Sequence, residues 1–383
     1  MNQNTFELAR IIQQFAKPFV QRYNPNAYHL RVLSAITQCR TSSLGGHVQA
    51  CDECGVISIS CNSCRNRHGP KCQGSKQVFW VEDLMKSTLP VKHYHVVFTL
   101  PHELNQVCLL DSAEYYNLLF AAAWDTLRAF GYARFGTETG AICVLHTWGQ
   151  NLSLHPHLHC IVPAAGVSLA GNWKNIGNGG KYLYPVPKLS VDFRRHFMKA
   201  LKTWLKKKVL LRQYQSLIDT AWNKPWVVHC EPSMAKPDHV VRYLGQYTHR
   251  VAITNNRILD VSNDNVTFLH KDYADKARQK PVTLDGVEFL RRFCMHILPF
   301  RFVKIRRFGV YSSVYKTMVQ KAQPGSRLKT TVKEPTRERL FRITGFDISL
   351  CKACKKGRMH RIKELPRVRS PGYLFVYSVN YCQ

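Results

Sequence analysis

The order of hydrophobic and polar positions along the chain predicts a mixture of helices and strands. Ile11, Phe15 and Phe19 recur at helical spacing, which predicts an amphipathic helix at the start. β-Branched and aromatic runs predict strands at 93–101, 141–148, 157–166 and 226–230. Longer amphipathic segments predict helices at 111–130, 191–211 and 236–247. The stretch 250–261 predicts a hairpin that turns at Asn255 and Asn256.

These elements fall into three zones, and 383 residues exceed what one compact core usually holds. Residues 1–85 contain the helical start and a cysteine cluster. Residues 86–275 alternate strands and helices, and residues 276–383 are short of acidic residues and strongly basic. We therefore expect three domains with these bounds.

The pattern of helices and strands predicts an α+β protein, and the charge balance indicates that its partner is a polyanion. Lys and Arg number 55 against 24 Asp and Glu, which gives a formal charge of +31. Nucleic acid is the first partner to expect and an acidic membrane surface the second. The apolar runs are too short to span a membrane, and the start does not have the layout of a signal peptide. We expect a cytoplasmic protein whose 14 cysteines serve as metal ligands or buried thiols.

The strand predicted at 157–166 carries two histidines on alternate positions. His157 and His159 can present both imidazoles to one face, with Leu158 turned to the core. Two imidazoles suit a divalent metal and leave positions open for substrate oxygens. Gln150 lies in a predicted turn and is a candidate third ligand. The alternative is that both histidines sit partly exposed on a sheet edge.

The helix predicted at 236–247 carries Tyr243 and Tyr247, four residues apart and therefore on one face. Read alone, they are ordinary core residues of an amphipathic helix. As nucleophiles they need activation, because a phenol has an unperturbed pKa near 10. His249 and Arg250 follow directly and could supply positive charge or hold the scissile phosphate.

The conjunction of these motifs resembles a known family. The blocks "LHTWGQNLSLHPHLHCIVPAAG", "YLGQYTHRVAITNNRI", "GGHVQACDECG" and "FVKIRRFGVYSS" are similar to the two-tyrosine rolling-circle transposases of the insertion-sequence-91 family, within the HUH superfamily. The resemblance implies an HUH endonuclease core, a central antiparallel sheet flanked by helices, with H-x-H on a middle strand. It also implies an N-terminal zinc-binding helical domain and a basic C-terminal DNA-binding region.

The same resemblance implies a chemistry and a set of roles. His157 and His159, with Gln150, would hold Mg²⁺ or Mn²⁺, and Tyr243 and Tyr247 would form 5′-phosphotyrosine links with single-stranded DNA. The implied partners are single-stranded DNA at transposon ends and target DNA, with host helicase or replication proteins, on the bacterial nucleoid and away from membranes. A related replication initiator or relaxase, and a non-catalytic zinc-containing DNA-binding protein, are the alternatives.

The cysteine cluster predicts a structural zinc site. Cys51 and Cys54 form a Cys-x2-Cys knuckle, which is a usual half of such a site. The second half is ambiguous, because the family that the chain resembles generally carries "HCPKC" where this chain has Gly69 in "HGPKC". We expect Cys51, Cys54, Cys64 and Cys72 as the zinc ligands, with Cys61 or His68 as replacements and buried free thiols as the alternative.

Two further features of the sequence leave their roles open. Arg65, Arg67 and Lys71 lie beside the cysteines and are predicted to contact DNA, although a zinc that only stabilises the fold is nearly as well supported. Cys351 and Cys354 form a second Cys-x2-Cys pair, which without a second half is a weak signal, and whether it binds a second zinc ion stays open.

Overall fold

The computed structural model describes residues 6–176, 183–231, 245, 251–272, 275–315, 317–319 and 334–368. The helix predicted at 236–247 lies outside the described residues except at Gly245. Tyr243, Tyr247, His249 and Arg250 are therefore also outside them.

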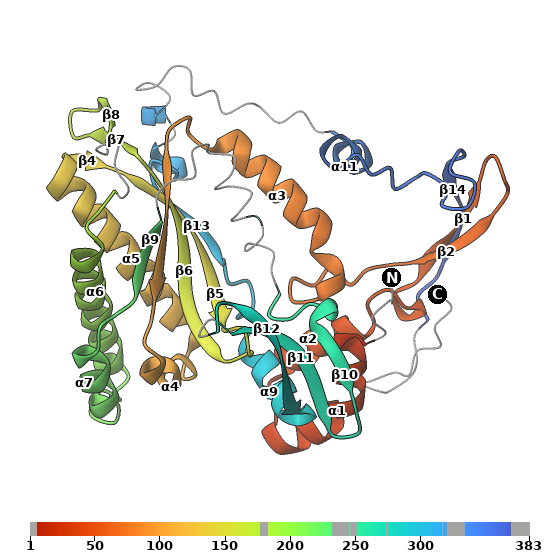
Figure 1. Ribbon diagram of the computed structural model, residues 1–383, viewed down its shortest axis with the longest axis horizontal. Coiled ribbons are helices and arrows are strands. Elements are labelled where there is room, and N and C mark those ends of the chain that lie inside the picture. Colours follow the sequence, from red (N-terminus) through yellow and green to blue (C-terminus); the bar gives the residue numbers. More distant parts are fainter. Residues whose placement is uncertain are drawn as a thin grey trace.

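A five-stranded antiparallel sheet forms the centre of the fold (Figure 1), in the order β13, β5, β6, β3, β9. Its strands are β3 (His93–Thr99), β5 (Gly140–Trp148), β6 (Leu154–Pro163), β9 (Val228–Glu231) and β13 (Ile305–Gly309). The four strands predicted from the sequence are confirmed as β3, β5, β6 and β9. Since β6 has a neighbour on each side, the sheet-edge alternative for His157 and His159 is wrong.

Long helices cover one face of this sheet. They are α5 (Ser112–Phe135), α6 (Val186–Lys207) and α7 (Gln215–Asn223), with the short η3 (His102–Leu104) and α4 (Asn105–Cys108) nearby. Asp111 caps α5 by accepting a hydrogen bond from the Glu114 N–H. Leu158 of β6 is fully buried in the same apolar cluster as Phe98 and Phe193, whose rings are 4.8 Å apart. The helices predicted at 111–130 and 191–211 are confirmed.

The opposite face of the sheet is partly covered by α3 (Gly74–Ser87). Leu84 of α3 is fully buried against Ile142 of β5 and Ile161 of β6, which pair directly across the two strands. Because side chains alternate along a strand, His157 and His159 share the face of Ile161. We call this side of the sheet the histidine face.

A second core joins the two N-terminal helices to a separate three-stranded sheet. It contains α1 (Leu8–Tyr23), α2 (Ala27–Thr37), α9 (Gly286–Met295), η4 (Asn255–Arg257), β10 (Ile258–Val261), β11 (Asn265–Asp272) and β12 (Arg278–Asp285). Ile11, Phe15 and Phe19 are buried in it, which confirms the predicted amphipathic helix.

The hairpin predicted at 250–261 is wrong, because β10 pairs with β11. A two-residue hairpin turn needs positive φ, and neither Asn255 nor Asn256 has it. They belong instead to the turn η4, which the Arg257 side chain ties to the carbonyl oxygens of Ala252 and Leu269.

Two small sheets complete the described fold. One contains β1 (Gly46–Cys51), β2 (Ile57–Cys61) and β14 (Met359–Leu365); the other contains β4 (Thr137–Glu138), β7 (Ala165–Ser168) and β8 (Trp173–Asn175). Short helical elements are η1 (Ser42–Leu44), η2 (Pro70–Cys72), η5 (Ser313–Tyr315) and α11 (Thr336–Thr344).

Strands from different sequence zones pair with one another within these sheets. β13 lies beyond position 276 yet belongs to the central sheet, and β14 pairs with β1 from the first zone. The predicted boundary at 275 also falls between the paired strands β11 and β12. Among the helices of the described residues, none has both the length and the apolar character needed to cross a bilayer.

Candidate active site

Three histidines converge on the histidine face of the central sheet. His157 and His159 come from β6, and His146 of β5 pairs directly with His157 across the strands. A ring nitrogen of each lies within 4.8 Å of those of the other two. His146 was not among the predicted ligands. The hairpin that joins β5 to β6 brings it to the pair.

The His157 imidazole is in a state suited to metal binding. Burial lowers the pKa of His157 to about 4, so its ring is neutral at pH 7. Its Nδ1 donates to the His155 carbonyl oxygen at 2.6 Å, which leaves the Nε2 lone pair free for a ligand role. Nitrogen ligands about 2.1 Å from one ion lie roughly 3–4 Å apart, so small side-chain shifts would close the group around a cation.

His95 of β3 extends the cluster as a supporting residue. Its Nε2 lies 2.9 Å from Nδ1 of His159, and the two rings are parallel with centroids 5.2 Å apart. If Nε2 of His159 binds a cation, its Nδ1 carries the proton and donates a hydrogen bond to Nε2 of His95. His95 would then fix both the tautomer and the orientation of His159.

Gln150 lies in the turn between β5 and β6, as predicted. The Gly149 N–H donates to the Ser153 carbonyl at 2.8 Å, and Leu152 has a positive φ of 61°. The backbone carbonyl of Gln150 accepts a hydrogen bond from Arg257. The role of Gln150 as a third ligand stays a prediction.

Gly245 is the one described residue between the two predicted nucleophiles, and it lies against α3. A Cβ atom at Gly245 would collide with Cγ2 of Val81. Val81 packs against the cluster formed by Leu84, Ile142 and Ile161 on the histidine face. Gly245 is therefore connected, through α3, to the strand that carries His159.

The four predicted zinc ligands do not come together in one site. Cys51 and Cys54 lie with Cys351 and Cys354, and we call this group the four-cysteine site. Cys64 and Cys72 lie instead with Cys39, and we call this group the three-cysteine site. The prediction of one site is wrong because β1 and β2 carry the first knuckle away from η2 and the end of α2.

The three-cysteine site has the spacing of a metal site, and the described residues supply three ligands to it. The Cys72 sulfur lies 3.3 Å from that of Cys39 and 3.6 Å from that of Cys64. The contact with Cys64 lowers the pKa of the Cys39 thiol to about 5, which favours a thiolate ligand. A Cβ atom at Gly69 would be only 3.7 Å from the Cys64 sulfur, so a cysteine there could complete the set.

His68, a candidate replacement ligand, is committed elsewhere. Its Nε2 accepts a hydrogen bond from the Leu298 N–H at 3.1 Å, and its Nδ1 lies 3.1 Å from Oδ1 of Asn66. Both ring nitrogens are therefore used within the fold, and burial lowers the pKa of His68 to about 3.

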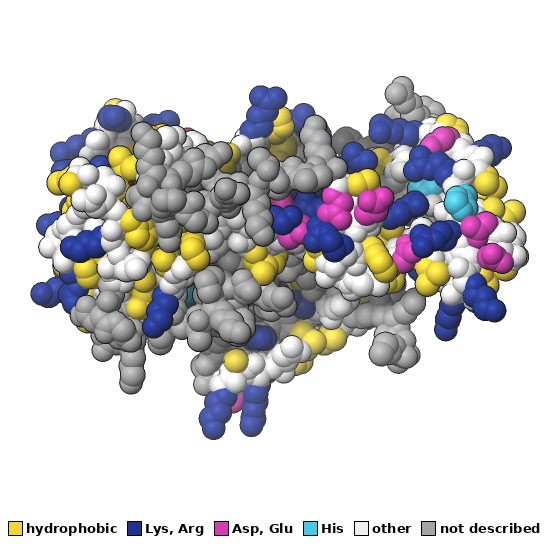
Figure 2. Space-filling model, turned by 90° about the horizontal axis from the view of Figure 1, so that it is seen from above, with side chains coloured by type: hydrophobic (Ala, Val, Ile, Leu, Met, Phe, Trp, Pro, Cys, Tyr) yellow, Lys and Arg dark blue, Asp and Glu magenta, His cyan; other side chains and the backbone are white. Residues whose placement is uncertain are grey.

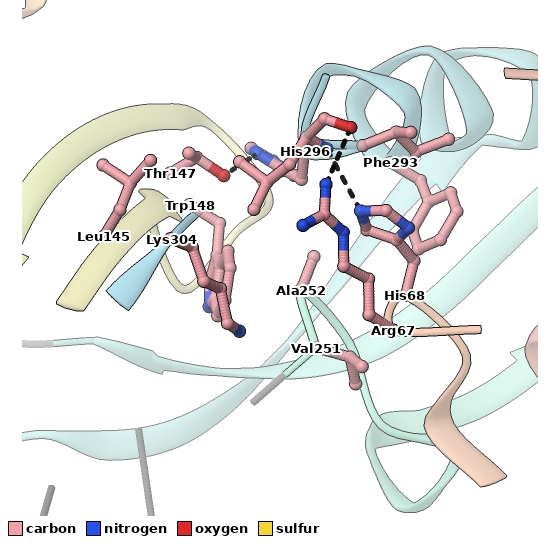
Figure 3. A pocket seen from close by; sticks show the side chains of 12 residues that line it. Arg67, His68, Leu145, Thr147, Trp148, Val251, Ala252, Phe293, His296 and Lys304 are labelled. Atoms are coloured by element: carbon pink, nitrogen blue, oxygen red, sulfur yellow. Dashed lines mark hydrogen bonds between the residues drawn. The ribbon is translucent and has the colours of Figure 1, made fainter. Parts of the chain in front are cut away.

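The three basic residues predicted to contact DNA have different surroundings. Arg67 points into the segment after α9 (Figure 3), where it donates to the carbonyl oxygens of Leu298, Pro299 and Phe302. These bonds argue against the predicted phosphate contact, because a phosphate would have to displace them. Lys71 pairs with Glu7 at 2.6 Å. Arg65 is exposed, and its contact with DNA stays a prediction.

Comparisons with known proteins identify first the class and then the family. Residues 140–318 match the family described as "Putative transposase", and residues 11–100 match the "Transposase zinc-binding domain". The chain is thus a transposase, a DNA-processing enzyme, with a zinc-binding domain that includes the three-cysteine site.

Two relatives match over most of the chain. "Putative transposase y4qJ" of Sinorhizobium fredii is 38% identical over 95% of this chain and 97% of its own length. The "Transposase for insertion sequence element IS801" of Pseudomonas savastanoi pv. phaseolicola is 26% identical over 85% of this chain and 82% of its own. The chain belongs to the insertion-sequence-91 family of transposases, which confirms the resemblance. No solved structure matches it.

Proposed function

We propose that this transposase nicks and rejoins single-stranded DNA at transposon ends by metal-assisted tyrosine transesterification, and so drives rolling-circle transposition. The observation that carries the proposal is the group of His146, His157 and His159 on one face of the central sheet. Gly245, between Tyr243 and Tyr247, contacts α3 on that same face and so supports a location of the tyrosines near the histidines.

The histidine group fits a divalent cation with open coordination positions. Its donors are ring nitrogens of two buried histidines and one half-buried histidine, and His95 lies within hydrogen-bonding distance of His159. Imidazole is a softer donor than Mg²⁺ prefers, so Mn²⁺ is the better match of the two expected ions. A bound cation would polarise the scissile phosphate and stabilise the charge that develops on its oxygens.

The proposed chemistry conserves the phosphodiester. The phenol oxygen of Tyr243 or Tyr247 bonds to phosphorus, the bond from phosphorus to the 3′ oxygen breaks, and a proton passes to that oxygen to give a free 3′-hydroxyl. The reverse attack by a 3′-hydroxyl rejoins the strand and frees the tyrosine, so no external energy source is needed. Two tyrosines allow a second strand to be cut while the first stays linked.

The positive charge supports a DNA partner. The net charge is +31, and Figure 2 shows Lys and Arg side chains spread from end to end of one face. Such a surface contacts many phosphates, so affinity should fall steeply as salt is raised. His249 and Arg250, which follow the tyrosines directly, are proposed to hold the scissile phosphate, and Arg65 to contact the DNA backbone.

The test is covalent capture of labelled single-stranded DNA from either end of the mobile element. With Mn²⁺ or Mg²⁺ present, we expect a DNA–protein band that survives denaturing electrophoresis. It should persist in Tyr243→Phe and in Tyr247→Phe and disappear in the double variant. His157→Ala and His159→Ala should lose it, because each removes a nitrogen from the group.

A matched control is His102→Ala, since the His102 imidazole is strongly exposed and is not a member of the histidine group. It should form the adduct like the wild type. If the wild type binds the DNA but forms no adduct with either end, the protein is a DNA-binding protein without this chemistry. An adduct in the double tyrosine variant would assign the nucleophile to another residue.

A further inference from the structure

Four cysteines from distant parts of the sequence meet at one end of the β14–β1–β2 sheet, at the right of Figure 1. The sulfur of Cys51 is 3.7 Å from that of Cys354, and the sulfur of Cys54 is 3.8 Å from that of Cys351. Thiolates bound tetrahedrally to zinc at about 2.3 Å lie about 3.8 Å apart. Disulfide sulfurs would be about 2.05 Å apart. The spacing is that of ligands around a shared ion.

The two Cys-x2-Cys segments have the same local conformation. The residue after each second cysteine has positive φ, 69° at Gly55 and 57° at Lys355. Each donates its N–H to the carbonyl of the first cysteine, Gly55 to Cys51 at 3.1 Å and Lys355 to Cys351 at 3.0 Å. Positive φ is uncommon for a residue such as lysine, so the second segment keeps an unfavourable backbone conformation to form this turn.

Gly357 lets the two segments approach each other. Its N–H donates to the sulfur of Cys354 at 3.3 Å, and its carbonyl accepts from the Cys351 N–H at 2.8 Å. A Cβ atom at Gly357 would collide with the sulfur of Cys51. The backbone therefore packs directly on the sulfurs and supplies a hydrogen bond to one of them, as supporting residues of metal sites do.

The sheet has little apolar core to hold it together. In the described part of the chain, the buried members of its cluster are Cys51, Cys351 and Met359. Ile57 and Ile59 of β2 remain 64% and 42% exposed. A sheet this small does not bury enough apolar surface for stability and usually needs a metal or another cross-link.

We propose that Cys51, Cys54, Cys351 and Cys354 bind one zinc ion that fastens β14 to the β1–β2 hairpin. The ion joins cysteines about 300 positions apart and is distinct from any ion in the three-cysteine site. It makes the zinc-binding domain a product of both ends of the sequence.

The C-terminal region also contacts α3, the helix on the histidine face of the central sheet. Between β13 and β14, α11 lies against α3, where Arg339 forms ion pairs with Glu82 at 2.7 Å and with Asp83. The zinc ion would thus hold β14, the strand that follows α11. The helix α11 itself is held on α3, which packs against β5 and β6. The C-terminal region is tied to the core at two points.

The first test is the zinc content of the purified full chain and four variants. We expect Cys51→Ser/Cys54→Ser and Cys351→Ser/Cys354→Ser each to lose one equivalent of zinc relative to the wild type. The quadruple variant should lose no more than either double variant, because all four residues share one ion. Cys294→Ala, which removes a buried thiol outside both sites, should lose none. Two equivalents lost by the quadruple variant, or wild-type zinc in Cys351→Ser/Cys354→Ser, would overturn the proposal.

The second test measures by hydrogen exchange whether the cysteines of the β1–β2 hairpin protect the amides of β14. In Cys51→Ser/Cys54→Ser, the amides of β14 should exchange at least tenfold faster, while those of α5 in the central core keep wild-type protection and show that the chain is folded. If α5 also loses protection, the same comparison is made on the wild type before and after chelation. Unchanged protection of β14 in a zinc-free protein, or two disulfides among the four cysteines, would refute the shared ion.

Discussion

Replacing His296 by glutamine should reduce the loss of stability on acidification. His296 at the end of α9 is buried; its Nε2 donates to the Leu152 carbonyl at 3.1 Å, and its Nδ1 lies 3.2 Å from the Thr147 hydroxyl. It thereby holds the β5–β6 turn that precedes the histidine strand (Figure 3 shows its contact with Thr147). Glutamine can keep the bond to Leu152 but cannot titrate.

The magnitude follows from the pKa. Burial lowers the pKa of His296 from 6.5 to about 4, so the unfolded chain binds a proton at pH values where the folded chain does not. This stability is present above pH 6.5 and is lost as pH falls from 6.5 toward 4. At pH 5, about 1.5 units below the unfolded value, the loss is about 2 kcal/mol at roughly 1.4 kcal/mol per unit.

The assay is denaturant unfolding of the wild type and His296→Gln at pH 7 and pH 5, with zinc present. The free energy of unfolding should fall about 2 kcal/mol further in the wild type than in the variant. Comparing the two proteins cancels acid effects on the cysteine sites and on other buried histidines. Equal losses in the two proteins would show that His296 is already protonated in the fold, and the reasoning would be refuted.

Further substitutions probe the other sites. Gly69→Cys should tighten zinc binding at the three-cysteine site by a factor of the order of 10–100 in a chelator competition, whereas Gly69→Ser should leave it unchanged. Arg67→Met should cost about 2–4 kcal/mol of stability, because it removes hydrogen bonds to three carbonyl oxygens, and it should not change the salt dependence of DNA binding. Arg65→Met should leave stability unchanged and lower the slope of the logarithm of the DNA-binding constant against the logarithm of salt concentration by about 0.7. His95→Phe should weaken Mn²⁺ binding by roughly 10–100-fold in a titration and leave cleavage at saturating Mn²⁺ largely intact, whereas equal affinity would remove His95 from the supporting role.

Local sequence patterns predicted the strands and helices that have a clear hydrophobic periodicity. The strands around His157 and the helix containing Phe15 follow from alternating and helical periodicity, and both are confirmed. The position of His146 beside the pair follows from the register of the β5–β6 hairpin, which periodicity alone does not give. Since Ile142 pairs with Ile161, counting along both strands sets His146 opposite His157.

Contacts between distant segments could not be predicted in this way. Cys54 and Cys351 are separated by 297 positions, and nothing near either one indicates the other. The single zinc site predicted from the sequence therefore combined ligands of two sites. Cys39 was missed because it stands alone after α2, without a second cysteine at knuckle spacing. The partners of Arg67 likewise belong to a segment more than 200 positions away.

The most direct test of the central proposal is identification of the residue that carries the DNA. After reaction with single-stranded transposon-end DNA and Mn²⁺, the adduct would be digested with nuclease and protease and sequenced by mass spectrometry. We predict a nucleotide joined through its 5′ phosphate to the peptide containing Tyr243 and Tyr247, on one or both phenol oxygens. A nucleotide on any other residue, or cleaved DNA with an unmodified tyrosine peptide at every time point, would contradict the two-tyrosine mechanism.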